Sequence, residues 1–426
     1  MTNQFRFLRS SRPKYVFQRQ RTGDRSAKKL IWLTTLQIDK TEFPVDNKFA
    51  RELVKTIGID DLFPRGTKPT LLCGKCQKLD FFEPYFHIDD TWAELEASLS
   101  RCDFCKMRWD VSQHLHAKKI SPLRFDRDGS MLKLNEGQLP VMSICRSSGE
   151  SSGSDVADHV HSFLIFRPEM NTTNDHFIQI GLPKLLPVAS KSYFDIIRQF
   201  VRNCNAKHPK CQPAKGSPLP TRLIDLGTRD SPTIRIYETQ DTDSIQYIAL
   251  SHPWGPYNKE HPHFCTFPQN LDEYKTNISF DKLPATFQHA VTTTRELDLR
   301  YLWIDSICII QGPDGDFAQE ATRMEDVFSS AYCVLAASSA MGQQDGFLNP
   351  RKENKYLVFE KGGQPLYVCQ FMDDFNAHVL EGPLSKRGWV LQERALAHRT
   401  IFFTDRQTYW ECGEGVRCET LTKMEK

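Results

Sequence analysis

A carboxylate on an apolar helix face is the first feature of this sequence that suggests chemistry. In the segment 388–396, Gly-Trp-Val-Leu-Gln-Glu-Arg-Ala-Leu, Trp389 and Glu393 are spaced i, i+4, so on a helix they lie on one face. An ionised carboxylate on such a face costs free energy unless it is paired or has a function. Two interpretations are open: pairing with Arg387 or Arg394, or a place in a binding site.

Two Cys-x-x-Cys pairs form a second candidate site. Cys73 and Cys76 are separated by 25 residues from Cys102 and Cys105. Each pair can turn two thiolates toward one ion, and together they complete the tetrahedral sulfur shell of a structural zinc site. The segment between the pairs is longer than the usual spacing of about 15 to 20 residues. We expect a structural zinc ion, with buried free thiols and a redox dithiol as the alternatives.

A third set consists of Cys204, His208 and Cys211. Their spacing suits a metal ion, but a fourth ligand is not evident along the sequence. Packed thiols are therefore the expected state, and a metal site is the alternative.

Length and composition indicate several domains in a chain that needs no charged partner. The chain has 426 residues and a formal net charge of +2. Single hydrophobic cores stop growing at about 250 to 300 residues, so we expect a basic tail at 1–40, an N-terminal region at 41–212 and a second domain at 222–426. The proline-rich stretch 213–220 marks the boundary.

Charge and hydropathy also indicate where the protein works. Residues 1–29 contain nine Lys or Arg and one acid, which is typical of a solvated tail, with an organelle-targeting peptide as the alternative. No apolar segment precedes a small-residue cleavage site, as a secretory signal requires, and no run approaches the roughly 18 apolar residues that span a bilayer. We expect a cytoplasmic protein with no nucleic-acid partner and no membrane span, in which cysteines are thiols or metal ligands rather than disulfides.

The elements that must position these residues alternate between strand and helix. The N-terminal region reads as mixed α+β, with strands at 139–145 and 162–166 and a helix at 193–204. In the second half, apolar runs predict buried strands and amphipathic stretches predict helices; the strands are 247–251, 301–309 and 332–337, and the helices are 284–297 and 317–331. This pattern predicts an α/β fold with a mostly parallel sheet and flanking helices.

Ligands bind beyond the carboxyl ends of the strands in such sheets. The segments that gather there supply the candidate binding residues Ser251, Trp254, Gly255, Asp305 and Gln311. Glu320 also falls inside an apolar helical stripe, so it is either paired with a buried basic side chain or faces the expected ligand site.

Several segments resemble the three blocks of the fungal heterokaryon-incompatibility (HET) domain. They are YIALSHPWG at 247–255, LPATFQHAV at 283–291 with YLWIDSICIIQ at 301–311, and RGWVLQERALA at 387–397 with Trp410-Glu-Cys behind it. The resemblance covers about 222 to 412. It departs at His252-Pro253, where the family more often has an aromatic residue and a cysteine, so no chemistry is assigned to that cysteine position.

HET domains are similar, more distantly, to Toll/interleukin-1 receptor (TIR) domains, which implies a flavodoxin-like fold. In that resemblance Trp389-x-x-x-Glu393 matches the TIR pattern in which a tryptophan precedes the catalytic glutamate by four residues. Several TIR domains cleave NAD+ between nicotinamide and ribose, which implies that Glu393 is catalytic and that Trp389 and Trp254 wall the nicotinamide ring. Nicotinamide leaves from a cationic state, so one carboxylate that stabilises the oxocarbenium-like transition state is sufficient.

The resemblance implies two kinds of function. The first is an NAD+ glycohydrolase that triggers cell death in fungal non-self recognition, with homo-oligomerisation on activation and an incompatibility partner that the sequence does not identify. The alternative is a non-catalytic module that self-associates or recruits a partner.

Overall fold

The structure, a computed structural model, describes most of the chain from residue 46 onward. The described ranges are 46–57, 70–116, 123–128, 131–135, 160–167 and 179–424, without 82, 84, 215, 229–231, 241, 261 and 362–363, and with the strand residues 18–19 and 32–33. The expected strand at 139–145 and most of the basic tail at 1–40 lie outside the described residues.

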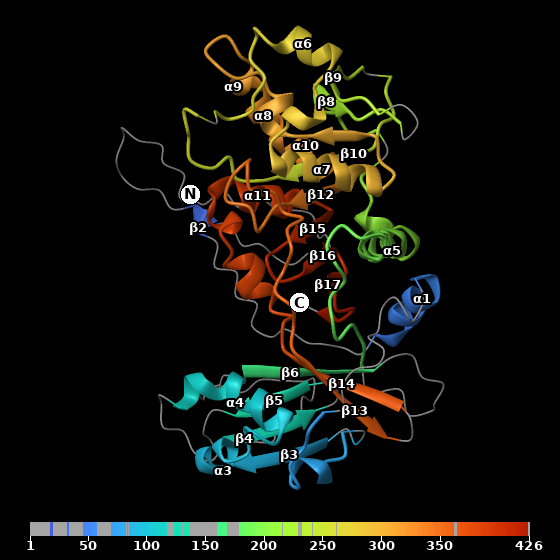
Figure 1. Ribbon diagram of the computed structural model, residues 1–426. Helices are drawn as coiled ribbons and strands as arrows, with labels where there is room; N and C mark the ends of the chain where they lie inside the picture. The colour runs from blue at the N-terminus through green and yellow to red at the C-terminus, as the bar shows by residue number, and fades with distance from the viewer. Residues whose placement is uncertain are drawn as a thin grey trace.

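An antiparallel sheet with helices beside it forms the N-terminal region (Figure 1). Its strand order is β13-β14-β6-β5-β4-β3, with β7 parallel to the end of β6. The strands are β3 (Tyr85–Asp90), β4 (Leu123–Asp128), β5 (Met131–Asn135), β6 (Val160–Arg167), β7 (Gln179–Ile180), β13 (Tyr356–Lys361) and β14 (Gln364–Gln370). A separate short pair is formed by β1 (Gln18–Arg19) and β2 (Trp32–Leu33).

The helices described in this region are α1 (Asn47–Ile57), the 3-10 helix η1 (Cys76–Lys78), α3 (Trp92–Glu96), α4 (Asp103–His116), α5 (Lys191–Lys207) and the 3-10 helix η2 (Pro209–Cys211). Three of them, α1, α4 and α5, have 11 residues or more, and the others have five or fewer. The prediction of a helix at 193–204 is confirmed by α5, which begins after the N-cap Ser190, whose side chain accepts a hydrogen bond from the backbone N–H of Tyr193.

A nine-stranded mixed sheet forms the larger layer, in the order β18-β17-β16-β15-β12-β10-β11-β8-β9. The strands are β8 (Arg222–Asp225), β9 (Arg235–Glu238), β10 (Tyr247–Ser251), β11 (Tyr301–Trp303), β12 (Cys333–Ala336), β15 (Arg399–Phe403), β16 (Thr408–Cys412), β17 (Gly415–Cys418) and β18 (Lys423–Met424).

The helices that accompany this sheet are mostly short, and none of the helices within the described ranges is long and apolar enough to cross a lipid bilayer. They are α6 (Leu271–Thr276), α7 (Ala285–Glu296), α8 (Asp305–Cys308), α9 (Phe317–Glu320), α10 (Met324–Ser330) and α11 (Gly388–Leu396), with the 3-10 helices η3 (Phe280–Lys282), η4 (Ala321–Arg323) and η6 (Leu384–Lys386) and the π-helix η5 (Asn376–Leu380).

The expectation of a mostly parallel sheet is wrong for the sheet as a whole. Among the described strands, three neighbouring pairs are parallel and five are antiparallel. The parallel pairs join the four central strands in the order β11-β10-β12-β15, which in chain order is 2-1-3-4, the beginning of a doubly wound arrangement. Strands β15 to β18 follow one another in the chain through short connections, which enforce antiparallel pairing on that side of the sheet.

The expected strand at 301–309 is also wrong beyond its first residues. The strand ends at Trp303, and 305–308 form the short helix α8. Both elements are largely buried, so the apolar run continues from the strand into the helix. Hydrophobicity alone does not distinguish a buried strand from a buried helix. The expected helix at 317–331 is divided into α9, η4 and α10, and Phe317 at its start is 56% exposed.

Residues of the two expected domains share one sheet and one core. Strand β14, at 364–370, pairs with β6 of the N-terminal sheet, so this sheet contains residues from both regions. Side chains of α1 and α5 lie in the same hydrophobic cluster as those of β10 and β12. The division at 213–220 remains a prediction.

Candidate functional site

Ser251 and Glu393 meet where the central strands reverse their order. Ser251 is the last residue of β10, and the neighbouring strands β11 and β12 lie on opposite sides of β10. Its hydroxyl donates a hydrogen bond to Glu393 Oε2 on α11. The carboxyl end of such a switch point is where doubly wound sheets bind ligands.

The environment of Glu393 favours its protonated form. Burial raises the pKa of Glu393 to about 7, the hydrogen bond from Ser251 opposes this, and the negative charge of Asp305 adds to it. Among the described residues, no Lys or Arg forms an ion pair with Glu393. The two pairing partners suggested by the sequence, Arg387 and Arg394, form their hydrogen bonds with other groups, and the positive charge of Arg387 only partly offsets the effect of burial on Glu393.

Arg394 holds α11 against the sheet. Its Nε and Nη2 donate to the two carboxylate oxygens of Glu411 on β16, each at 2.8 Å. The guanidinium also lies over the rings of Phe375 and Phe402, at 5.3 and 5.7 Å. A bidentate pair of this kind fixes direction as well as distance, so it orients the helix that presents Glu393.

Arg387 and His252 connect the end of β10 to the start of α11. Arg387, the N-cap residue of α11, donates from Nη1 to the carbonyl oxygen of His252. The His252 ring is buried edge-on to Phe287, with Nδ1 3.8 Å from Asp305 Oδ1. Burial lowers the pKa of His252, so the ring is neutral at pH 7.

Trp254 is held by the same carboxylate. Its indole Nε1 donates to Asp305 Oδ2 at 2.7 Å. Asp305 also accepts from the backbone N–H of Ser306 at 2.7 Å, at the start of α8. The helix that replaces the expected strand therefore positions the acid that anchors Trp254.

A surface hollow of about 390 Å³ lies beside this group. Its walls include Trp254, Gly255, Met341, Leu384 and Arg387. The volume is in the range of small-molecule sites. Glu393 is outside these walls, and Arg387 is the residue that belongs to the hollow and also acts on the Glu393 carboxylate.

Gly255, one of the residues that line this hollow, permits a close contact with Gly342. Its φ is +82°, and an added Cβ would lie 2.9 Å from Gly342 Cα. Residues with side chains rarely adopt this conformation, so glycine is required here on two grounds.

Two predicted site residues, Gln311 and Glu320, have other surroundings, and the side chain of a third, Trp389, is not described. The backbone N–H of Gln311 donates to Thr266 O at 2.7 Å, and its side chain donates to Ile309 O at 3.1 Å. Glu320 is buried and accepts a hydrogen bond from Thr221 at 2.7 Å, with Arg323 3.8 Å away. Trp389 lies in α11, but its side chain is outside the described part of the chain. Their substrate-binding roles stay predictions.

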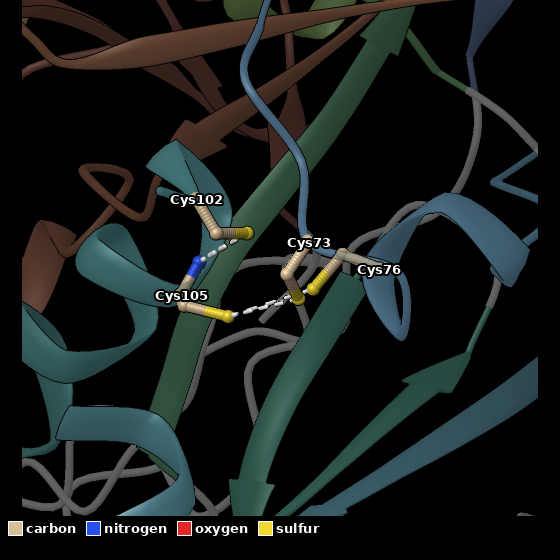
Figure 2. A group of neighbouring side chains, drawn as sticks. All are labelled: Cys73, Cys76, Cys102 and Cys105. Carbon is tan, nitrogen blue, oxygen red and sulfur yellow. Dashed lines mark hydrogen bonds between the residues drawn. The ribbon is translucent and has the colours of Figure 1, made fainter. Parts of the chain in front are cut away.

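The four cysteines of the two Cys-x-x-Cys pairs converge, as Figure 2 shows. Cys105 Sγ is 3.8 Å from Cys73 Sγ and 3.6 Å from Cys76 Sγ, and all four sulfurs lie within 4.8 Å of one another. Zinc–sulfur bonds of about 2.3 Å place two sulfurs of a tetrahedral site about 3.8 Å apart. The donor set therefore fits a metal ion.

A buried arginine completes the surroundings of this cluster. Arg108 is fully buried, pairs with Asp90 and donates from Nη2 to Cys105 Sγ at 3.3 Å and Cys76 Sγ at 3.6 Å. Such donors stabilise sulfurs that carry negative charge.

Sequence reasoning did not identify two of the residues around Glu393. His252 was noted only as a departure from a family pattern, and Arg387 only as an ion-pair partner. The available signal for Arg387 was its position immediately before the predicted helix.

Part of the chain is similar in sequence to known proteins. Residues 247–393 match the family described as "Heterokaryon incompatibility protein (HET)". The chain is 26% identical to "Heterokaryon incompatibility protein 6, OR allele" of Neurospora crassa, over 42% of this chain and 32% of that protein. The match thus spans about a third of the length of that relative. No solved structure matches the chain.

Proposed function

The chain is a HET-domain protein, and from this premise we propose that it acts in fungal incompatibility by cleaving NAD+ between nicotinamide and ribose. Water adds to the ribose carbon, so the products are ADP-ribose, nicotinamide and a proton. Loss of NAD+ would then cause the incompatibility cell death. The protein would work in the cytoplasm and assemble into a homo-oligomer on activation.

The observation that supports this proposal is the position of Glu393. It lies at the switch point, where β11 and β12 flank β10, and accepts a hydrogen bond from Ser251. A carboxylate there can hydrogen-bond the ribose hydroxyls and stabilise positive charge on the ribose as nicotinamide leaves. In the substrate complex, the ribose hydroxyls would replace the Ser251 hydroxyl as hydrogen-bond donors to Glu393. The bound substrate would therefore favour the ionised form of the Glu393 carboxylate.

The hollow beside this pair offers room for the rest of the substrate. Trp254 supplies an aromatic wall, and Arg387 supplies a cation for the diphosphate. Trp389, by the TIR-like pattern, would form the other side of the nicotinamide site. Zinc at the four-cysteine cluster would be structural, because four protein sulfurs leave no position for substrate.

The decisive experiment measures nicotinamide release from NAD+ by the concentrated purified protein and by Glu393→Gln. The variant keeps the shape of the side chain and removes its charge, so cleavage should fall at least about 100-fold, since charge stabilisation in the transition state is lost. Glu325→Gln, on the exposed face of α10, is the matched control and should cleave at the parental rate.

Cell killing on expression in a fungal host gives the second readout, with thermal unfolding as the check on folding. A folded Glu393→Gln protein that neither cleaves NAD+ nor kills supports the enzyme. If that folded variant kills as well as the parent, the protein is a non-catalytic recruitment module and the proposal is withdrawn.

A further inference from the structure

A second group of metal-ligating side chains lies where α5 meets the mixed sheet, away from the four-cysteine cluster. Its members are Cys204, His208, Cys211 and Cys412, whose ligand atoms all lie within 4.8 Å of one another. The first three come from α5, the residue after it and η2. The fold adds the fourth from the end of β16, 204 residues after His208.

The distances within this group match those of a zinc site. Cys412 Sγ is 3.5 Å from His208 Nδ1. Bonds of about 2.3 Å to sulfur and about 2.0 Å to nitrogen place two tetrahedral ligands of these kinds about 3.5 Å apart.

The turn after β16 brings its backbone close to the sulfurs. The backbone N–H groups of Gly413 and Glu414 donate to the sulfurs of Cys211 and Cys412, respectively. A Cβ on Gly413 would lie only 3.3 Å from Cys211 Sγ, so glycine allows this approach. Donors aimed at sulfur are typical of metal-bound cysteines.

A buried cation beside the group lacks a counter-charge. Arg399, which pairs with Cys412 across β15 and β16, is 1% exposed. Its guanidinium lies over the Tyr332 ring at 4.9 Å, and none of its three nitrogens has a hydrogen-bond partner among the described residues. An unpaired buried charge is costly. A divalent ion with three thiolates and a neutral imidazole carries one net negative charge, which would balance Arg399.

We propose that this group of three cysteines and one histidine binds a second zinc ion, which fastens α5 to β16. All four positions of the ion are filled by protein ligands, so its role is structural. The ion also supports the candidate catalytic helix, because Cys412 follows Glu411, the partner of Arg394 on α11.

Zinc content of the purified full chain tests the proposal without any measurement of NAD+ cleavage. The parent should hold two zinc equivalents per chain, and Cys412→Ser and Cys105→Ser should each hold one. Cys333→Ser, which removes a buried cysteine outside both groups, is the matched control and should retain both. A parent with one equivalent, or a folded Cys412→Ser protein with two, would overturn the proposal.

Cys412→His keeps four ligands and therefore covers the case in which Cys412→Ser does not fold. Loaded with Co²⁺, this variant should bind two equivalents but show weaker sulfur-to-cobalt absorption than the parent, because one of seven thiolates has been replaced by imidazole. Unchanged sulfur-to-cobalt absorption would mean that Cys412 is not a ligand, and the second site would be rejected.

Discussion

At the scale of single residues, the burial of Glu393 determines both the proposed chemistry and a cost in folding free energy, and the hydrogen bond from Ser251 reduces that cost. Burial raises the pKa of Glu393 from an ordinary value of 4.5 to about 7. The folded state therefore holds a proton that the unfolded state releases at lower pH, and folding loses stability as pH rises from 4.5 toward 7. Above pH 7 the loss is complete.

Glu393→Gln should accordingly stabilise the protein in alkali but not in acid. At pH 4.5 both side chains are neutral, so the two proteins should unfold at similar temperatures. The difference should grow through pH 7 and then level off, reaching at most about 3 kcal/mol. Calorimetric melting between pH 5 and 9 measures it, and a difference that does not depend on pH would contradict the pKa assignment.

The sequence placed Glu393 on a helix and Ser251 at a strand end, but not the contact between them. It offered Arg387 and Arg394 as partners because both are near in the chain. In the fold, Arg394 pairs with Glu411 and Arg387 donates to a backbone carbonyl. Contacts made through the sheet have no signal in local spacing.

At the scale of elements, the turn after β10 is the most constrained part of the candidate site. Strand β10 was predicted with its observed bounds because its five residues are all buried and are followed by Pro253 and Gly255. The change from strand β11 to helix α8 was not predicted. The side chains on both sides of the change are mostly buried and apolar, and such a run is compatible with either a strand or a helix.

Gly255→Ala should destabilise the protein by about 1 to 3 kcal/mol, because the new Cβ meets Gly342 and the positive φ is strained. Gly74→Ala is the control, since a Cβ there meets nothing within 4 Å. Urea denaturation compares the two. Equal midpoints for both variants would show that the turn relaxes freely.

At the scale of the whole molecule, cysteine clusters join parts that the sequence separates. The four-cysteine cluster was recognisable because its pairs have a regular spacing. The fourth member of the second group was not, because Cys412 is brought to Cys204 only by the pairing of strands across the mixed sheet. The return of β13 and β14 to the N-terminal sheet was hidden for the same reason.

Loss of the four-cysteine site should destabilise the whole protein, because its cysteines lie in the small core of the N-terminal sheet. Cys105→Ser should lower the melting temperature by at least about 5 °C, since a structural metal contributes directly to folding. Calorimetry with and without a chelator measures this. If the variant has the same melting temperature as the parent, and the chelator does not change the melting temperature of the parent, the cluster does not stabilise the fold.

The pairing of β14 with β6 also sets an order of events on the ribosome. Phe163 of β6 pairs with Gln370 of β14, so that edge of the strand has no neighbour until the later segment has been synthesised. At about 5 to 20 residues per second, the delay is on the order of 10 to 40 seconds. During that interval the nascent chain presents an open strand edge, and chaperones that cover such edges would be needed at this stage of synthesis.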